Sequence, residues 1–325
     1  MSKIYEALRQ AELDRAKTGS TQSENGSSLP LRSILEDEQD ALLSNGSRPT
    51  SSFAMSGRGL SPLAAASGTS SVVANALDLT KVNVVRWSPS MLQLPALEQR
   101  GSAVEQFRSL RSRMQEFRDL NALKTLMVSS GLPQEGKSFV AANLAISFAR
   151  HKAGRVLLID GDMRRATVHK LLGAPQGPGL TEYLSGTASL LEVMQRANVD
   201  DPDHPLPSGL ASLTFIPAGT EHDKAADLSG NHRFGQLIKE VSPSFDWIVV
   251  DSSPVNLVSD GVNLARACDA VLLVARGGVT KYEVAQRAIA ELKASKVLGL
   301  VLNAVKNPPV SGGYYGYDGY DKIEE

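Results

Sequence analysis

From residue 123 onward the chain alternates between short apolar runs and segments with helical spacing. Each apolar run is nearly continuous rather than alternating, which is typical of strands buried on both faces of a sheet. The predicted strands are 123–130, 155–160, 213–219, 246–251, 270–276 and 297–305. Segments such as 140–151 and 281–294 repeat apolar residues at helical spacing between the strands. This order predicts an α/β fold, a doubly wound and mostly parallel sheet with helices on both faces.

The N-terminal part of the chain has a different composition. Residues 1–17 place apolar side chains at helical spacing between charges, which predicts a short amphipathic helix. Residues 18–95 are rich in Ser, Gly and Pro, so we expect a largely disordered linker. We therefore predict one folded domain over 96–305, followed by a flexible tail over 306–325.

Composition and charge exclude several classes of protein. The 325 residues are 42% hydrophobic, which excludes fibrous and fully disordered chains. A formal net charge of -1 gives no overall field for a nucleic-acid backbone, so no nucleic-acid partner is predicted. No stretch approaches the ~20 apolar residues of a membrane span. We expect a soluble, cytoplasmic protein.

A phosphate-binding loop is the most specific motif. Residues 131–138, Gly-Leu-Pro-Gln-Glu-Gly-Lys-Ser, fit G-x-x-x-x-G-K-S between a predicted strand and a predicted helix. In such a loop the main-chain N–H groups and the lysine bind phosphates, and the serine hydroxyl ligates Mg²⁺. The predicted nucleotide contacts are Gly131, Gln134, Glu135, Gly136, Lys137, Ser138 and Phe139. Asn303, at the end of the last predicted strand, is either an adenine contact or a turn-forming residue.

Three carboxylates follow predicted parallel strands, at the edge where such sheets bind ligands. Asp160 and Asp162 lie two residues apart, so both can face a metal ion or a hydroxyl that is to be deprotonated. Asp251 ends another strand and matches a carboxylate that holds a metal ion through water. The predicted metal ligands are Ser138, Asp162 and Asp251. The alternative is a set of solvated strand ends.

Taken together, these motifs resemble those of the bacterial protein-tyrosine kinases of capsule and exopolysaccharide systems. The resemblance is carried by the loop 131–138, by Leu-Leu-Ile-Asp-Gly-Asp-Met-Arg-Arg at 157–165, and by Asp251 with Pro254. Residues 1–16 resemble the start of the stand-alone kinases that accompany exosortase systems. The resemblance implies ATP as the nucleotide, Mg²⁺ as the cofactor and tyrosine as the phosphate acceptor.

The same resemblance assigns roles to the tail and to one helix. The predicted acceptors are Tyr314, Tyr315, Tyr317 and Tyr320, four of the seven tyrosines of the chain. Glu105, Arg108 and Arg111 are spaced like the family's oligomerisation motif, which implies a ring-like homo-oligomer with phosphorylation between subunits. Without the resemblance, this stripe of charges is an ordinary solvated face.

The implied catalytic residues are Lys137, Asp160, Asp162 and Asp251. Lys137 stabilises charge on the transferred phosphoryl group, and Asp160 is the candidate base for the tyrosine hydroxyl. The implied partners are a membrane polysaccharide co-polymerase, which activates the kinase at the inner membrane, and a tyrosine phosphatase. The implied role is control of polysaccharide polymerisation and export.

Several departures from the family pattern keep two other hypotheses open. Gln134 stands where the family has glycine, and it strains the loop if its φ is positive. Such departures suggest a weakly active, kinase-like scaffold. The other hypothesis is an ATPase switch of the partition or septum-positioning type. Those proteins carry a lysine where this chain has Leu132.

Overall fold

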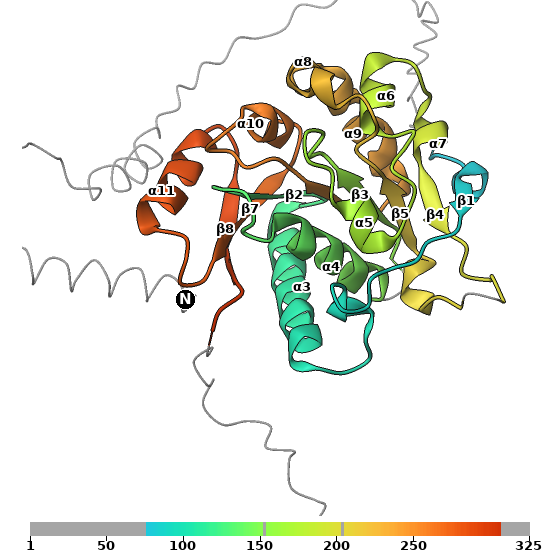
Figure 1. The fold of residues 1–325 in the computed structure, drawn as a ribbon, viewed down its shortest axis with the longest axis horizontal. Coiled ribbons are helices and arrows are strands. Elements are labelled where there is room, and N and C mark those ends of the chain that lie inside the picture. Colours follow the sequence, from blue (N-terminus) through green and yellow to red (C-terminus); the bar gives the residue numbers. More distant parts are fainter. Residues whose placement is uncertain (1–75, 152–153, 203–204, 307–325) are drawn as a thin grey trace, which may run out of the picture. The chain divides into compact units, whose positions relative to one another are not determined.

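The computed structural model describes residues 76–151, 154–202 and 205–306 (Figure 1). The predicted N-terminal helix, most of the predicted linker and the four tail tyrosines lie outside the described residues. Among the described residues, no helix is long and apolar enough to cross a bilayer.

A single sheet of eight strands organises the described part of the chain. Its order is β1-β4-β5-β3-β6-β2-β7-β8, and all pairs are parallel except β4 with β5. The strands are β1 (Asn83–Val85), β2 (Thr125–Ser130), β3 (Val156–Asp160), β4 (Gln195–Ala197), β5 (Leu213–Ile216), β6 (Trp247–Asp251), β7 (Ala270–Arg276) and β8 (Val297–Asn303). The six predicted strands all occur, and the predicted mostly parallel α/β fold is confirmed.

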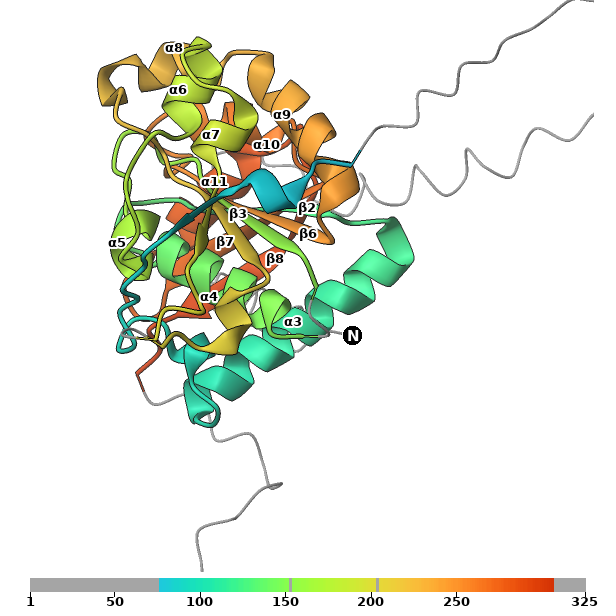
Figure 2. The same ribbon diagram turned by 90° about the vertical axis from the view of Figure 1, so that its right-hand side faces the viewer.

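Helices cover both faces of this sheet (Figures 1 and 2). The α-helices are α3 (Ser102–Asn121), α4 (Lys137–Ala149), α5 (Val168–Leu172), α6 (Leu180–Ser185), α7 (Leu190–Val193), α8 (Ala225–Ser229), α9 (Arg233–Val241), α10 (Asp260–Ala265) and α11 (Tyr282–Glu291). Short 3-10 turns are η1 (Leu79–Lys81), η2 (Pro95–Leu97), η3 (Ser208–Leu210), η4 (His222–Lys224) and η5 (Ser242–Ser244).

The central strands contribute to two hydrophobic cores, one on each face. In β2, Leu126 and Val128 face the core that contains α3 and α4, whereas Met127 faces the core that contains α9 and α10. The same alternation separates Val249 from Val250 in β6. Burial on both faces explains why these strands are continuous apolar runs in the sequence.

The folded region starts earlier than the predicted boundary at residue 96, so the predicted linker is wrong for its last part. The strand β1 pairs with β4, and neither strand was predicted because both are three residues long and partly polar. Trp87, which follows β1, is 1% exposed and packs edge-on against Phe215 with ring centroids 6.1 Å apart. Its indole N–H donates to Gln195 Oε1 at 3.2 Å.

A buried asparagine on α4, Asn143, forms hydrogen bonds with the later part of this N-terminal segment, residues 93–96. Asn143 Oδ1 accepts a hydrogen bond from Ala96 N at 3.0 Å, and its Nδ2 donates to Gln93 O at 3.1 Å. Because α4 follows the phosphate-binding loop directly, residues 77–97 support the helix that carries the predicted site.

We predict that Trp87→Ala lowers the free energy of unfolding by about 3–5 kcal/mol, since it removes a buried indole and leaves a cavity. Urea unfolding followed by circular dichroism measures this change. Leu92→Ala is the matched control because Leu92 is 92% exposed in the same segment. Equal stability of the two variants would show that residues 77–97 are not part of the cooperative fold.

Candidate nucleotide-binding site

The predicted phosphate-binding loop and the three predicted carboxylates meet at the carboxyl ends of three neighbouring strands, β2, β6 and β3. The loop after β2 leads into α4, which begins at Lys137. Asp160 and Asp251 are the last residues of β3 and β6, and they are paired in register. This edge is where open parallel sheets bind their ligands.

The main chain of the loop turns through two residues with positive φ. Gly136 has φ of 96°, and a Cβ there would lie 2.0 Å from Asn303 Nδ2, so only glycine fits. Gln134 has φ of 64°, so the condition for strain at this position, a positive φ in a residue other than glycine, is met. A non-glycine residue in this left-handed conformation costs roughly 1–2 kcal/mol.

Two side chains brace the loop from within the protein. Glu135 is buried; its Oε2 accepts a hydrogen bond from Leu132 N at 2.8 Å, and its Oε1 accepts one from Thr280 Oγ1. Asn303 Nδ2 donates to Glu135 O at 2.9 Å. Asn303 therefore holds the loop in place, and its contact with adenine stays a prediction. Thr280 lies outside every motif of the sequence and was not predicted as part of the site.

Lys137 lies among carboxylates. Its Nζ is 2.6 Å from Asp162 Oδ2, 3.7 Å from Asp251 Oδ2 and 3.2 Å from Ser138 Oγ. Burial disfavours the charged amine, but the charges of Asp251 and Asp162 outweigh it, so the pKa of Lys137 is raised. The lysine is therefore charged at neutral pH.

Asp160 is fully buried and serves as an acceptor for the main chain that follows it. Its oxygens accept hydrogen bonds from the N–H groups of Asp162, Thr167 and Val168 at 3.1–3.2 Å. Burial and the nearby charge of Asp251 raise its pKa well above the usual range.

Asp251 is equally buried, yet no hydrogen bond from the described residues reaches either of its oxygens. Burial raises its pKa to about 6, against the opposing effect of Lys137. Asp162 lies beside it, with Oδ1 accepting from Ser253 Oγ at 3.0 Å. Lys137 is shared between Asp162 and Asp251, so its single positive charge offsets only part of their negative charge, and a bound cation would supply the remainder.

The donor set fits Mg²⁺. In the described part of the chain there is no group of three or more His, Cys, Asp and Glu side chains placed to hold a metal ion. Magnesium, however, binds through one or two carboxylates and takes its other oxygens from phosphates and water. Asp162, Asp251 and the Ser138 hydroxyl supply oxygens of that kind, so these three residues would hold the ion.

A cavity of about 520 Å³ opens in front of the loop, in the size range of small-molecule sites. Five predicted residues line it, namely Gln134, Gly136, Lys137, Ser138 and Phe139, and Asp162 joins them. Gly131 lies apart from the lining, where a Cβ would come within 2.9 Å of Val284 Cγ1.

Further residues line the cavity that were not predicted as contacts, although Pro133, Arg164, Arg165 and Pro254 lie within the quoted motifs. The further residues are Pro133, Arg164, Arg165, Thr167, Ser253, Pro254, Leu257 and Val258. Arg164 is held by Asp260, with Nε 2.6 Å from Oδ2 and Nη2 3.3 Å from Oδ1. Its neighbour Arg165 is exposed at the cavity and adds positive charge there.

The three residues of the predicted oligomerisation stripe, Glu105, Arg108 and Arg111, do not share one set of contacts in the structure. Glu105 and Arg108 form an ion pair on the exposed side of α3. Arg111 instead reaches α4 of its own chain, where Nη1 donates to Ser147 O at 3.1 Å. The intersubunit contact of this stripe stays a prediction.

The sheet, the loop and the carboxylates together define a P-loop nucleotide-binding protein. No family model matches the chain. It is 32% identical over 224 residues to the tyrosine-protein kinase CpsD of Streptococcus agalactiae, covering 68% of this chain and 91% of that protein. The chain therefore belongs to the bacterial tyrosine-protein kinases.

Two further comparisons agree with this assignment. The chain is 30% identical over 223 residues to the tyrosine-protein kinase Wzc of Salmonella typhimurium, covering 67% of this chain but only 29% of that protein. The solved kinase domain of the Escherichia coli tyrosine kinase ETK superposes with a TM-score of 0.60 and 28% identity. That match covers 70% of this chain and 85% of the ETK chain.

We predict that Gln134→Gly raises the free energy of unfolding by about 0.5–1 kcal/mol, because glycine adopts positive φ without strain. Thermal melting without nucleotide measures the change. Gln236→Gly on the exposed face of α9 is the matched control, and it should be destabilising by about 1 kcal/mol. A loss of stability in both variants would contradict strain at Gln134.

We also predict that Asp251→Asn removes most of the Mg²⁺ dependence of ATP binding, a change of roughly 10–100-fold for a residue that orients a metal ion. ATP titrations in Mg²⁺ and in EDTA measure the effect. Asp227→Asn, at an exposed position of α8, removes the same charge and should bind as the wild type does. An unchanged Mg²⁺ dependence in Asp251→Asn would remove this residue from the metal site.

Proposed function

We propose that the protein is an ATP-dependent tyrosine autokinase whose acceptors are Tyr314, Tyr315, Tyr317 and Tyr320. One observation carries the proposal: in a chain of the tyrosine-protein kinase family, a charged Lys137 lies between Asp162 and Asp251 beside the phosphate-binding loop.

Lys137 and the loop bind the phosphates of ATP. Because two carboxylates keep the lysine charged, its ammonium group stabilises negative charge on the transferred phosphoryl group. Ser138, Asp162 and Asp251 would hold Mg²⁺, which neutralises charge on the β- and γ-phosphates when it is bound. The exposed Arg165 supplies a further positive charge at the cavity.

The tyrosine hydroxyl needs a base, because its pKa is about 10 in water. Asp160 remains our candidate. Burial raises its pKa, which makes its carboxylate a stronger base than an exposed one. Its oxygens accept three main-chain hydrogen bonds, so the proposed role requires the tyrosine to replace one of those donors.

We further propose that phosphorylation occurs between the subunits of a ring-like homo-oligomer. The exposed pair Glu105 and Arg108 supports this, since it is open to contact by another subunit. In this proposal the protein is cytoplasmic and lies at the inner membrane through an activating polysaccharide co-polymerase. A tyrosine phosphatase reverses the modification, and the cycle regulates polymerisation and export of an exopolysaccharide or capsule.

The test is incubation of the purified full chain with ATP and Mg²⁺, followed by intact-mass measurement and phosphotyrosine detection. We expect several phosphates on the chain, and none in Lys137→Met, which lacks the charge that contacts the phosphates. Lys293→Met, exposed just after α11, is the matched control. Replacement of the four tail tyrosines by Phe should remove most of the signal while ATP still binds.

The other outcomes separate the remaining hypotheses. ATP binding without phosphotyrosine, even with an activating partner fragment, would contradict the kinase and favour the scaffold, which the strain at Gln134 supports. ATP hydrolysis without phosphotyrosine would favour the ATPase switch.

A further inference from the structure

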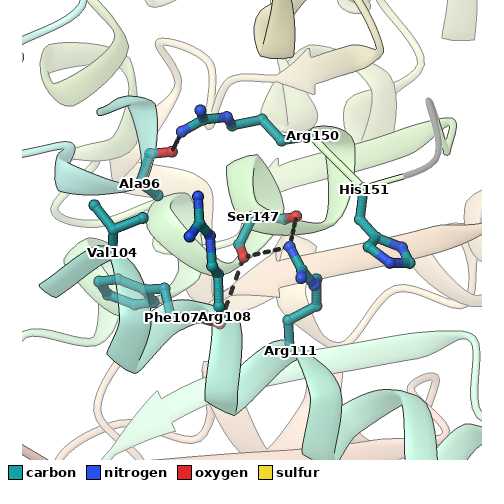
Figure 3. Close-up of a pocket in the computed structure, with 8 residues that line it drawn as sticks. All are labelled: Ala96, Val104, Phe107, Arg108, Arg111, Ser147, Arg150 and His151. Atoms are coloured by element: carbon teal, nitrogen blue, oxygen red, sulfur yellow. Dashed lines mark hydrogen bonds between the residues drawn. The ribbon is translucent and has the colours of Figure 1, made fainter. Parts of the chain in front are cut away.

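A second cavity of about 240 Å³ lies between α3 and the C-terminal end of α4 (Figure 3). Three arginines line it, Arg108 and Arg111 from α3 and Arg150 directly after α4. The helix α4 has 13 residues, so the cavity is roughly 20 Å from the phosphate-binding loop at its other end. We call this cavity the arginine pocket.

The arginines of the pocket are balanced mainly by neutral acceptors. Arg111 Nη1 donates to Ser147 O at 3.1 Å, and Arg150 Nη1 donates to the main-chain oxygens of Ala96 and Glu98. Among these contacts the only carboxylate is that of Glu105, which pairs with Arg108 and is 61% exposed. Three guanidinium groups thus face one exposed carboxylate.

Stabilisation of the end of α4 does not account for all three cations. A positive charge at a helix C-terminus is favourable, and the bond from Arg111 to Ser147 O serves that purpose. Each further guanidinium adds repulsion: burial, and then the charge of Arg108, lower the pKa values of Arg111 and Arg150. Arg111 Nε is also buried without a hydrogen-bond partner among the described residues. An anion in the pocket would reduce the repulsion between the guanidinium groups and would accept a hydrogen bond from Arg111 Nε.

Part of the lining of the pocket is apolar. Val104 and Phe107 of α3 are buried, and Ala96 of η2 lies beside them. The ring of Phe107 is fixed by Phe139, with ring centroids 5.7 Å apart. The lining thus combines guanidinium groups with apolar side chains, which suits a ligand that has a charged end and a flat, nonpolar body.

We propose that the arginine pocket binds an aryl phosphate, namely a phosphorylated tyrosine of the tail of this chain or of another copy. A phosphotyrosine carries a charge of about -1.5 to -2 and three acceptor oxygens, which suit the three guanidinium groups. Its ring lies along Val104 and Phe107. This inference rests on the proposed function, because the autokinase makes the ligand.

The test uses the full chain after phosphatase treatment, without ATP, so that binding does not depend on kinase activity. The probes are a synthetic peptide of residues 312–320 with phosphate on Tyr315, the unphosphorylated peptide, phenyl phosphate and inorganic phosphate. We expect the phosphopeptide to bind at least tenfold more tightly than the unphosphorylated peptide. Phenyl phosphate should bind more tightly than inorganic phosphate, and equal affinities would overturn the assignment to tyrosine.

Two variants locate the binding. Arg150→Gln should weaken the phosphopeptide roughly tenfold or more, because a charge-assisted fork is lost. Arg113→Gln is the matched control: Arg113 is exposed on α3 and does not line the pocket. Equal binding by the two variants would overturn the site.

Arg150 also donates hydrogen bonds to the main chain of Ala96 and Glu98, so Arg150→Gln can weaken binding by unfolding this region locally. A second variant separates that effect from the loss of a ligand contact. Arg108→Gln removes a half-exposed side chain whose polar partners among the described residues are Glu105 and the Gln99 main chain, so it should weaken the peptide without lowering the melting temperature. Displacement of the peptide by ATP with Mg²⁺ would place it at the nucleotide site instead and overturn the proposal. If the kinase assay fails while the synthetic phosphopeptide binds, only the proposed function is lost.

Discussion

The site is organised around one lysine that is buried among three aspartates at the ends of β3 and β6. Lys137 contacts Asp162 and Asp251, and Asp160 lies in register with Asp251 on the adjacent strand. Three carboxylates and one amine leave an excess of negative charge in a place with little water. Such an arrangement costs stability, so its presence points to a function that uses a cation and a phosphate.

The backbone around this cluster permits the close approach of the strands. Gly161 follows Asp160, and its N–H donates to Asp251 O at 2.9 Å. A Cβ at that position would lie 2.6 Å from the same oxygen, so any larger residue would push β3 away from β6. The spacing Asp-Gly-Asp therefore does two things: it brings two carboxylates to the site and lets the strand ends meet.

Much of this could be predicted from the sequence, and the rest depends on contacts that have no local signal. The strands β2, β3, β6 and β7 are apolar on both faces, so their pattern identifies them. β4, with Gln195 and Arg196, is recognisable only once its neighbours are known. The loop and the carboxylates follow from short motifs. The bond between Glu135 and Thr280 joins residues 145 positions apart, and it exists because β7 lies next to β2 in the sheet.

The helix α4 sets a fixed distance between the nucleotide site and the arginine pocket. Twelve of its 13 residues are buried, and Ala141, Ala142 and Ala145 let it lie close against the sheet. A helix packed along its whole length moves as one body, because bending it would open gaps on both sides. The distance between the two ends of α4 is therefore constant. A substitution of the small residues at its middle would therefore displace the phosphate-binding loop at one end and Arg150 at the other, relative to Arg108 and Arg111 on α3.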